Sequence, residues 1–183
     1  MKNQIRKEMK ARRAAMTKEE VAQKSMTAAD AFLKSEIYKN AETIMLYMPL
    51  GNETDTSEII KAAFADEKRL VLPVTDEKTG EITPVFFEET SVLEKGGFSI
   101  REPKNSHIAE KSAIDVVIVP GIAFDKRGAR VGFGKGCYDM FLKDMQTVKI
   151  GFCYDFQLVG EIPSEEHDIK MDFVVTEKGF FEC

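Results

Sequence analysis

Residues 114–139 decide the fold: the apolar run IDVVIVP (114–120) leads toward the glycine-rich segment RVGFGKGCYD (130–139). A nearly unbroken apolar run of this length predicts a strand that is buried on both faces. After the glycines, apolar side chains at positions 138, 141, 142 and 145 recur at helical spacing, which predicts an amphipathic helix. We therefore expect the glycine-rich segment to join a strand to a helix, as in α/β proteins.

The glycine-rich segment has the composition of a phosphate-binding loop. Its alternate glycines allow positive φ and bring several N–H groups close to one anion, next to the positive end of the following helix. Arg130 and Lys135 would neutralise phosphate oxygens, and Asp139 could hold a metal ion that bridges them. The spacing matches neither a Walker loop nor a G-x-G-x-x-G dinucleotide fingerprint. The alternative is a glycine-rich surface turn.

Outside this segment, helical and strand patterns alternate along the chain. Good helix formers predict helices at 2–15 and 18–34, the second with Thr17 as its N-cap, and helical spacing predicts another helix at 56–66. Short apolar runs predict strands at 43–47, 69–73, 148–152 and 173–176. Residues 74–112 carry turn signals and are expected to form an insertion that contains a hairpin. The alternation predicts a single-domain α/β three-layer sandwich over 1–183, with a mainly parallel sheet, helices on both faces and ligands at the carboxyl ends of the strands.

The composition is that of one globular domain. The chain has 183 residues, of which 43% are hydrophobic and 31% charged, and its net charge is -5. These values favour a single core and disfavour a nucleic-acid partner. Since no apolar run could span a membrane and no apolar region follows the basic N-terminal segment, we expect no membrane association and a cytoplasmic location. Three cysteines without metal-binding spacing are expected to be free thiols.

Several further segments are informative when they are taken together. They are, in chain order, Lys2 and Arg6, ETDT (53–56), Glu102-Pro103, PGIAFD (120–125), Arg127-Gly128, the glycine-rich segment with Tyr138-Asp139, and His167-Asp168 with Asp172. In type and order, these segments resemble the 5-formyltetrahydrofolate cyclo-ligase family. The resemblance covers essentially the whole chain and is more specific than a glycine loop alone.

The resemblance implies the ATP-dependent cyclisation of 5-formyltetrahydrofolate to 5,10-methenyltetrahydrofolate, with release of ADP and phosphate. The γ-phosphoryl group would pass to the formyl oxygen, and N10 would then attack the activated carbon and expel phosphate. ATP and reduced folate would be the ligands, Mg²⁺ would be the metal, and the working unit is expected to be a monomer. Catalysis would depend on positioning and charge neutralisation rather than on a protein nucleophile.

The resemblance also implies roles for individual residues. ATP binding is expected at Lys2, Arg6, Arg130, Gly132, Phe133, Gly134, Lys135, Gly136, Cys137 and Tyr138. Folate binding is expected at Arg6, Met48, Glu53, Phe133, Gly134, Lys135, Gly136 and Cys137. Magnesium would be held by Asp139 and Asp172, and the catalytic residues would be Arg130 and Lys135. Cys137 departs from the family, in which many members carry an aromatic residue at this position.

From the residues alone, two of the expected binding segments have structural alternatives. Lys2 and Arg6, four apart on a helix, could grip one polyanion or could form a solvated basic face. Glu53 could accept hydrogen bonds from a pterin ring or could cap the next helix. Asp55 and Thr56 are nearer the helix start and are better cap candidates, so Glu53 is expected to be free for a ligand.

The metal site and the function have alternatives as well. Asp139 could complement a helix N-terminus, and Asp172 could be a turn residue. His167 is expected to have a structural hydrogen-bonding role. One alternative function is an isomerase that holds a single phosphate and does not hydrolyse ATP. The other is a regulatory module that binds a nucleotide but has no small substrate.

Overall fold

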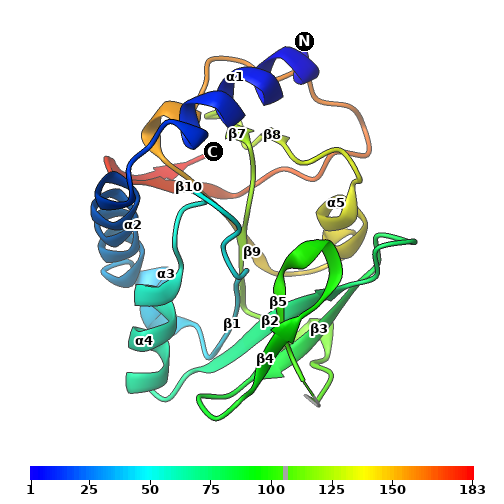
Figure 1. The fold of residues 1–183 in the computed structure, drawn as a ribbon. Coiled ribbons are helices and arrows are strands. Elements are labelled where there is room, and N and C mark those ends of the chain that lie inside the picture. The colour runs from blue at the N-terminus through cyan, green and yellow to red at the C-terminus, as the bar shows by residue number, and fades with distance from the viewer. Residues whose placement is uncertain (105–106) are drawn as a thin grey trace.

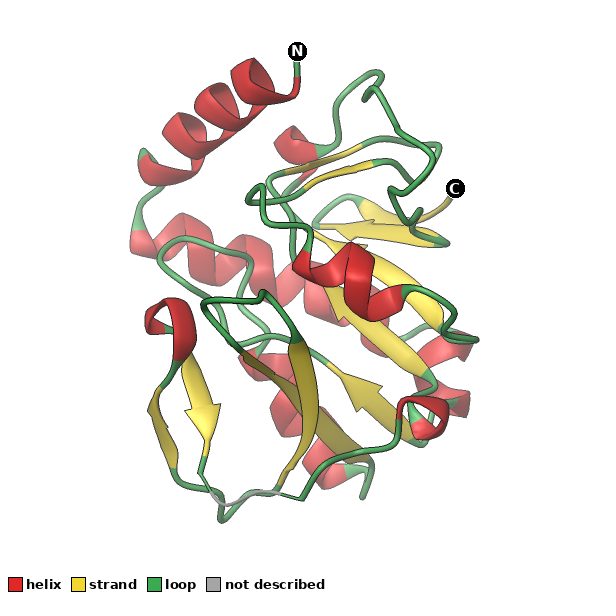
Figure 2. Cartoon of the chain, turned by 90° about the vertical axis from the view of Figure 1, so that its right-hand side faces the viewer, coloured by secondary structure: helices red, strands yellow, loops and turns green. Residues whose placement is uncertain are grey.

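The computed structural model describes residues 1–104 and 107–183, which are built around a seven-stranded sheet (Figure 1, Figure 2). The strand order is β11-β10-β9-β6-β1-β2-β3. These strands are β1 (Thr43–Met45), β2 (Arg69–Thr75), β3 (Ile82–Phe87), β6 (Val116–Val119), β9 (Val148–Phe152), β10 (Phe173–Thr176) and β11 (Gly179–Glu182). The inner strands run parallel to one another, and the edge strands β11 and β3 are antiparallel to their neighbours. The mainly parallel sheet is therefore confirmed.

Helices cover both faces of this sheet, because successive side chains of a strand point to opposite faces. In β1, Ile44 packs on the side of α2 (Lys18–Leu33) and α4 (Ser57–Ala65), and α3 (Glu36–Asn40) lies in the same layer. The next residue, Met45, packs on the side of α5 (Cys137–Leu142). Figure 1 shows these two layers on either side of the strands. The three-layer sandwich expected from the sequence is confirmed.

Local signals place the ends of several helices. The Thr17 hydroxyl accepts from the Glu20 N–H at 3.1 Å, and the Glu20 carboxylate accepts from the Thr17 N–H at 2.8 Å, so a complete capping box starts α2. The Asp55 carboxylate accepts from the Ser57 N–H at the start of α4. The expected continuation of α5 to position 145 is wrong, because the helix ends at Leu142 and the chain then turns through a positive φ of 63° at Asp144.

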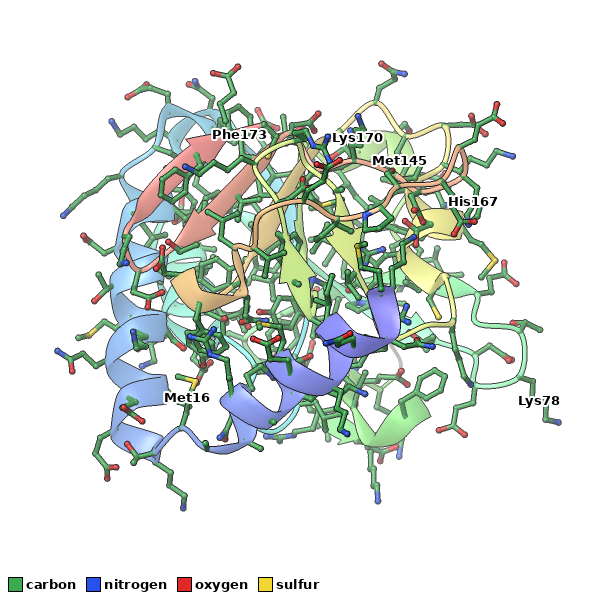
Figure 3. All side chains as sticks on the ribbon, turned by 90° about the horizontal axis from the view of Figure 1, so that it is seen from above. Met16, Lys78, Met145, His167, Lys170 and Phe173 are labelled. Atoms are coloured by element: carbon green, nitrogen blue, oxygen red, sulfur yellow. The ribbon has the colours of Figure 1, made fainter. Side chains whose placement is uncertain are left out.

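The N-terminal helix α1 (Lys2–Ala14) lies across a small hairpin formed by β7 (Ala123–Phe124) and β8 (Arg130–Val131). Figure 3 looks down on α1 and on this end of the molecule. The sequence did not predict the hairpin, which follows β6 and delivers the chain to the glycine-rich segment. The strand that enters this segment is therefore β8 rather than β6. Across residues 1–104 and 107–183, every helix is too short or too polar to cross a bilayer.

The insertion at 74–112 is divided between two sheets. Its turn at 76–80 joins β2 to β3, so β3 extends the main sheet, while β4 (Leu93–Lys95) and β5 (Arg101–Pro103) form a separate hairpin. The outer edge of β3 is already hydrogen bonded: the Phe86 N–H donates to the His107 carbonyl and the Ala109 N–H donates to the Pro84 carbonyl. The expected hairpin is confirmed, but part of the insertion belongs to the central sheet.

Candidate active site

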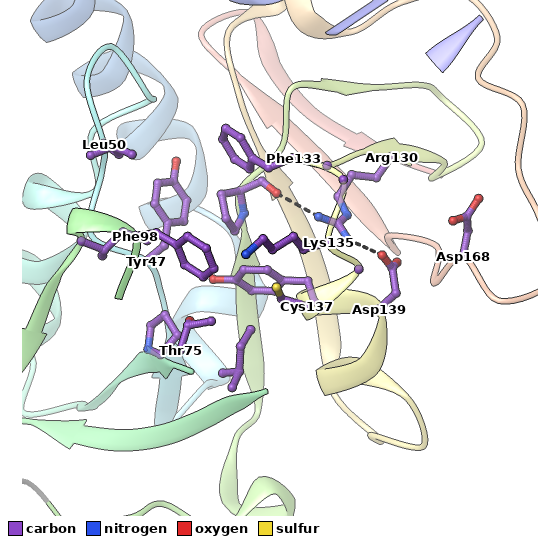
Figure 4. A pocket seen from close by; sticks show the side chains of 18 of the residues that line it. Tyr47, Leu50, Thr75, Phe98, Arg130, Phe133, Lys135, Cys137, Asp139 and Asp168 are labelled. Atoms are coloured by element: carbon purple, nitrogen blue, oxygen red, sulfur yellow. Dashed lines mark hydrogen bonds and ion pairs between the residues drawn. The ribbon is translucent and has the colours of Figure 1, made fainter. Parts of the chain in front are cut away.

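A cavity of about 870 Å³ opens at the carboxyl ends of the parallel strands (Figure 4). It is lined by residues that follow β1, by the last residues of β2, by Pro120 after β6, by α1 and by the glycine-rich segment. The carboxyl edge of the sheet is where ligands are expected to bind in this class of fold. All the expected binding residues from Lys2 to Tyr138 line this cavity, and so does Asp139.

The glycine-rich segment forms an exposed part of the cavity wall. Gly134 and Gly136 have φ of 110° and 67°, values that side-chain-bearing residues rarely adopt, so glycine is required at both positions. Gly136 is the N-cap of α5, and no side chain caps this helix. At Gly134 and Gly136, the segment therefore presents its backbone to a ligand, and no side chain at these two positions blocks the approach of the ligand.

One end of the cavity carries paired charges. The Arg130 side chain is almost fully buried; its Nη2 donates to the Asp139 Oδ2 at 3.0 Å and its Nη1 donates to the Pro120 carbonyl at 3.3 Å. The Lys2 Nζ donates to the Asp168 Oδ2 at 2.7 Å. Burial alone would raise the pKa of Asp168, but the hydrogen bond from Lys2 and the Glu165 N–H lower it on balance. We call Lys2, Arg130, Asp139 and Asp168 the charged end.

Asp172 does not lie at the charged end. It precedes β10, and so it sits at the amino edge of the sheet, whereas the cavity opens at the carboxyl edge. Its Oδ2 accepts from the Lys149 N–H at 2.7 Å and lies 3.1 Å from the Lys149 Nζ. The structure therefore does not bring Asp172 together with Asp139, and the expected magnesium pair is not assembled. Asp168, four residues before Asp172 in the chain, lines the cavity instead.

The opposite end of the cavity is mainly apolar. Glu53 is buried there; its Oε2 accepts from the Leu50 N–H at 2.9 Å, and its Oε1 lies 3.7 Å from the Arg13 Nη1. Burial raises the pKa of Glu53, and the Leu50 N–H and Arg13 oppose this rise. Together with Glu53, we call the following residues the apolar end: Tyr47, Met48, Leu50 and Phe133.

Lys135 lies between the two ends, as Figure 4 shows. Its Nζ donates to the Glu77 carbonyl at 3.2 Å and lies 4.3 Å from the centroid of the Phe98 ring. Arg6 also connects elements of the wall, because its Nε donates to the Gly132 carbonyl at 2.9 Å. Both cations are thus held by contacts that a stronger anionic partner could replace.

Comparison with known proteins agrees with the sequence resemblance. Residues 1–177 match the model of the 5-formyltetrahydrofolate cyclo-ligase family. The chain belongs to this family. The 5-formyltetrahydrofolate cyclo-ligase of Escherichia coli (strain K12) is 32% identical over 177 residues, which cover 93% of this chain and 97% of the relative. The mouse 5-formyltetrahydrofolate cyclo-ligase is 29% identical over 189 residues, with 96% and 93% covered.

A solved structure of the cyclo-ligase family has the same fold. The NMR structure of Aquifex aeolicus 5,10-methenyltetrahydrofolate synthetase superposes with a TM-score of 0.87 and 31% sequence identity, over 99% of this chain and 92% of the other. These relatives confirm the family, the fold and the class of enzyme that the sequence resembles.

Sequence reasoning missed several residues of this cyclo-ligase cavity. Asp168 has no binding role among the sequence expectations, yet it lines the cavity together with Glu165 and His167. Its position directly after His167, in a segment that resembles the family, is a signal that could have indicated this. Phe98 and Ile100 also line the cavity, but they lie in the insertion, where no periodic pattern indicated which side chains turn inward.

Proposed function

We propose that the protein cyclises 5-formyltetrahydrofolate to 5,10-methenyltetrahydrofolate and converts ATP to ADP and phosphate in the same reaction. Beyond family membership, the observation that carries the proposal is the position of Lys135 between the charged end and the apolar end of one cavity. A cation at this point can stabilise a phosphoryl group that passes from a nucleotide at one end to a ring substrate at the other.

The charged end suits the triphosphate. Lys2 and Arg130 already bond carboxylates, so phosphate oxygens can take over these charge-assisted hydrogen bonds by an exchange of partners. The exposed backbone of Gly134 and Gly136 allows the phosphates to approach closely. Arg6, Cys137 and the other residues implied by the family resemblance would complete this contact surface.

The apolar end suits the reduced pterin. A pterin presents an amino group and a ring N–H side by side, and a carboxylate such as Glu53 can accept hydrogen bonds from both. Met48 and Phe133 line the same cavity and would supply apolar surface for such a ring. Binding at both ends would hold the formyl oxygen and the γ-phosphoryl group near Lys135, which is the positioning that this reaction requires.

The chemistry would follow from this positioning. The formyl oxygen attacks the γ-phosphorus, and the bond from phosphorus to the bridging oxygen of ADP breaks. N10 then attacks the formyl carbon and gives up its proton to solvent, and the carbon–oxygen bond breaks so that the oxygen leaves as phosphate, which closes the ring. Lys135 and Arg130 would stabilise the charge that develops on the transferring group, and no protein side chain would form a covalent bond.

Magnesium would be held by Asp139 and Asp168. Both line the charged end, and carboxylate oxygens are the ligands that Mg²⁺ prefers; nucleotide-bound Mg²⁺ usually takes only one or two from protein. Within the described residues no group of three or more His, Cys, Asp or Glu is placed to hold a metal ion, which agrees with an ion that arrives on the nucleotide. When bound, it would offset negative charge on the phosphates. Asp172 is not part of this proposal.

The test is an assay of purified protein with 5-formyltetrahydrofolate, ATP and Mg²⁺, in which the product's absorbance and released phosphate are followed together. We expect both signals to rise in a one-to-one ratio and only when folate and ATP are both present. Phosphate release without folate consumption, or nucleotide binding without either signal, would contradict the proposal and favour a regulatory module. An activity on phosphorylated metabolites without ATP would favour an isomerase.

A further inference from the structure

The last turn of α1 carries two neighbouring arginines with different surroundings. The Arg13 Nη1 lies 3.7 Å from the Glu53 Oε1, and the two side chains are only 13% and 8% exposed. Arg12 instead stacks over the Phe156 ring, 4.6 Å from its centroid, and does not line the cavity. Taking two charges out of water costs free energy that their attraction only partly offsets. The buried pair of Arg13 and Glu53 therefore costs free energy, which a functional role of the pair would explain.

Arg13 also contacts two other segments around the apolar end, the loop that carries Glu53 and the segment that carries Phe133. The Asn52 Nδ2 donates to the Arg13 carbonyl at 2.9 Å and to the Met16 carbonyl at 3.1 Å, so the loop that carries Glu53 is tied to the end of α1. The Arg13 guanidinium lies 5.9 Å from the centroid of the Phe133 ring. Arg13 itself does not line the cavity, and so it can act on a ligand only through Glu53 and Phe133.

We propose that Arg13 is a positioning residue for folate: it keeps Glu53 ionised and aimed into the cavity as the acceptor for the pterin donors. This inference rests on the proposed function, since it assumes that Glu53 binds the pterin. It goes beyond that function because it assigns folate affinity, and the pH range in which folate binds, to a residue that contacts neither substrate.

The charges around Glu53 support this role. Besides Arg13 on α1, the titratable groups that face it are Tyr47 after β1, Tyr138 on α5 and Tyr154, whose hydroxyl donates to the Glu53 carbonyl at 3.1 Å. Burial raises the pKa of each of these tyrosines, so all three stay neutral in the range where Glu53 titrates. Burial also raises the pKa of Glu53, and Arg13 is a cation that opposes this rise.

The sign of the pH dependence follows. Ionised Glu53 accepts two hydrogen bonds from the pterin, whereas protonated Glu53 does not, so folate affinity falls as the pH drops through the pKa of Glu53. If Arg13 is replaced by a neutral side chain, this pKa rises further. The loss of affinity on the acidic side then begins at a higher pH.

The experiment measures the Kd of 5-formyltetrahydrofolate without ATP, from pH 5.5 to 8, together with both KM values. For Arg13→Met we expect the Kd for folate at neutral pH to be about tenfold weaker. We also expect the fall in folate affinity at low pH to begin about one pH unit higher, the effect typical of removing one nearby opposite charge. The KM for ATP should stay within about twofold. Arg13→Lys should restore most of the affinity, and Arg12→Met is the matched control, which should leave the Kd unchanged.

Glu53→Gln separates this inference from the proposed function. In the Glu53→Gln protein, Arg13→Met should cause no pH shift and at most a small further loss through Phe133, because the carboxylate through which Arg13 mainly acts is absent. Equal losses of ATP and folate affinity in Arg13→Met, or a loss that adds fully to that of Glu53→Gln, would overturn the inference and indicate that Arg13 only docks α1. If Arg13→Met does not fold, Arg13→Gln and Arg13→Lys are compared in the same way. If Glu53→Gln itself binds folate normally, the pterin site of the proposed function fails as well.

Discussion

At the charged end of the cavity, each cation is already paired: Lys2 lies 2.7 Å from Asp168 and Arg130 lies 3.0 Å from Asp139. At the apolar end, a single buried carboxylate, Glu53, has one cation behind it at 3.7 Å. A ligand at the charged end must therefore exchange partners with side chains that are already ion-paired. A ligand at the apolar end meets an acceptor carboxylate that is already buried. We infer that substitutions at the charged end should change turnover and metal dependence, and that substitutions at the apolar end should change folate affinity.

The largest effect is expected for Lys135→Met, between the two ends. Removing the cation from the transferring phosphoryl group should lower kcat by about 10²- to 10³-fold, the loss typical of deleting one group that stabilises transition-state charge. The Lys135 contacts in the free protein are an exposed carbonyl and a ring face, so the melting temperature should hardly change. Lys78→Met, on the neighbouring turn with its side chain pointing outward (Figure 3), is the control. Near-normal turnover of a folded Lys135→Met protein would refute its catalytic role.

The next largest effect is expected on the Mg²⁺ dependence of activity, and it tests whether Asp168 or Asp172 is a magnesium ligand. In Asp168→Asn and in Asp139→Asn, the Mg²⁺ concentration for half-maximal activity should rise by about tenfold, since an oxygen ligand loses its charge. In Asp172→Asn it should change less than about twofold, because this carboxylate bonds Lys149 outside the cavity. Titration of activity with Mg²⁺ at saturating ATP measures this. A large shift in Asp172→Asn alone would restore the expectation from the sequence.

A smaller effect is expected at the apolar end for Phe133→Leu. The ring is 50% exposed at the cavity wall, and loss of its contact with the substrate should weaken folate binding by about 1 kcal/mol, or roughly fivefold. The KM for ATP should change less than the KM for folate. Val92→Ala, which shortens an exposed apolar side chain away from this cavity, serves as the control. A selective rise in the KM for ATP would place Phe133 at the nucleotide instead.

The smallest effect is on stability, in Lys2→Met. The ion pair with Asp168 is partly exposed, so its loss should lower the free energy of unfolding at pH 7 by less than about 1 kcal/mol. Because the folded-state pKa of Asp168 is lowered, this stabilisation is present above the unfolded pKa of about 3.9 and is lost as the pH falls through the lower folded-state pKa. Urea unfolding at a series of pH values from 7 downward measures the difference, which should shrink in acid. A difference that stays constant as the pH falls would point to lost packing.

Much of the fold could be predicted because its signals are local. Apolar runs marked the inner strands, and the capping residue Thr17 with Glu20 placed the start of α2. The small β7–β8 hairpin and the membership of β3 in the main sheet could not be predicted, because both depend on pairing between segments rather than on the pattern within one. The end of α5 at Leu142 was missed for a similar reason, since apolar spacing continues through Met145 although the chain turns.

The candidate site shows the same limit. The glycine-rich segment could be located because its glycines and cations are contiguous in the chain. Asp168 and Asp172 are only four residues apart and are chemically identical, so only the direction of the chain decides which one reaches the cavity. That direction is set by the strand β10, whose amino end carries Asp172 away to Lys149. Arg13 could not be found from the sequence, because its partner Glu53 is forty residues distant and the pairing needs the folded structure.

The outer edge of β3 is already hydrogen bonded, and this affects association between copies of this protein. An edge strand with unpaired N–H and C=O groups is a template for strand addition from another molecule, and so for aggregation. Here the segment around His107 and Ala109 already occupies that template, and Pro84 within β3 has no N–H to offer. We expect concentrated solutions of the folded protein to resist sheet extension along this edge.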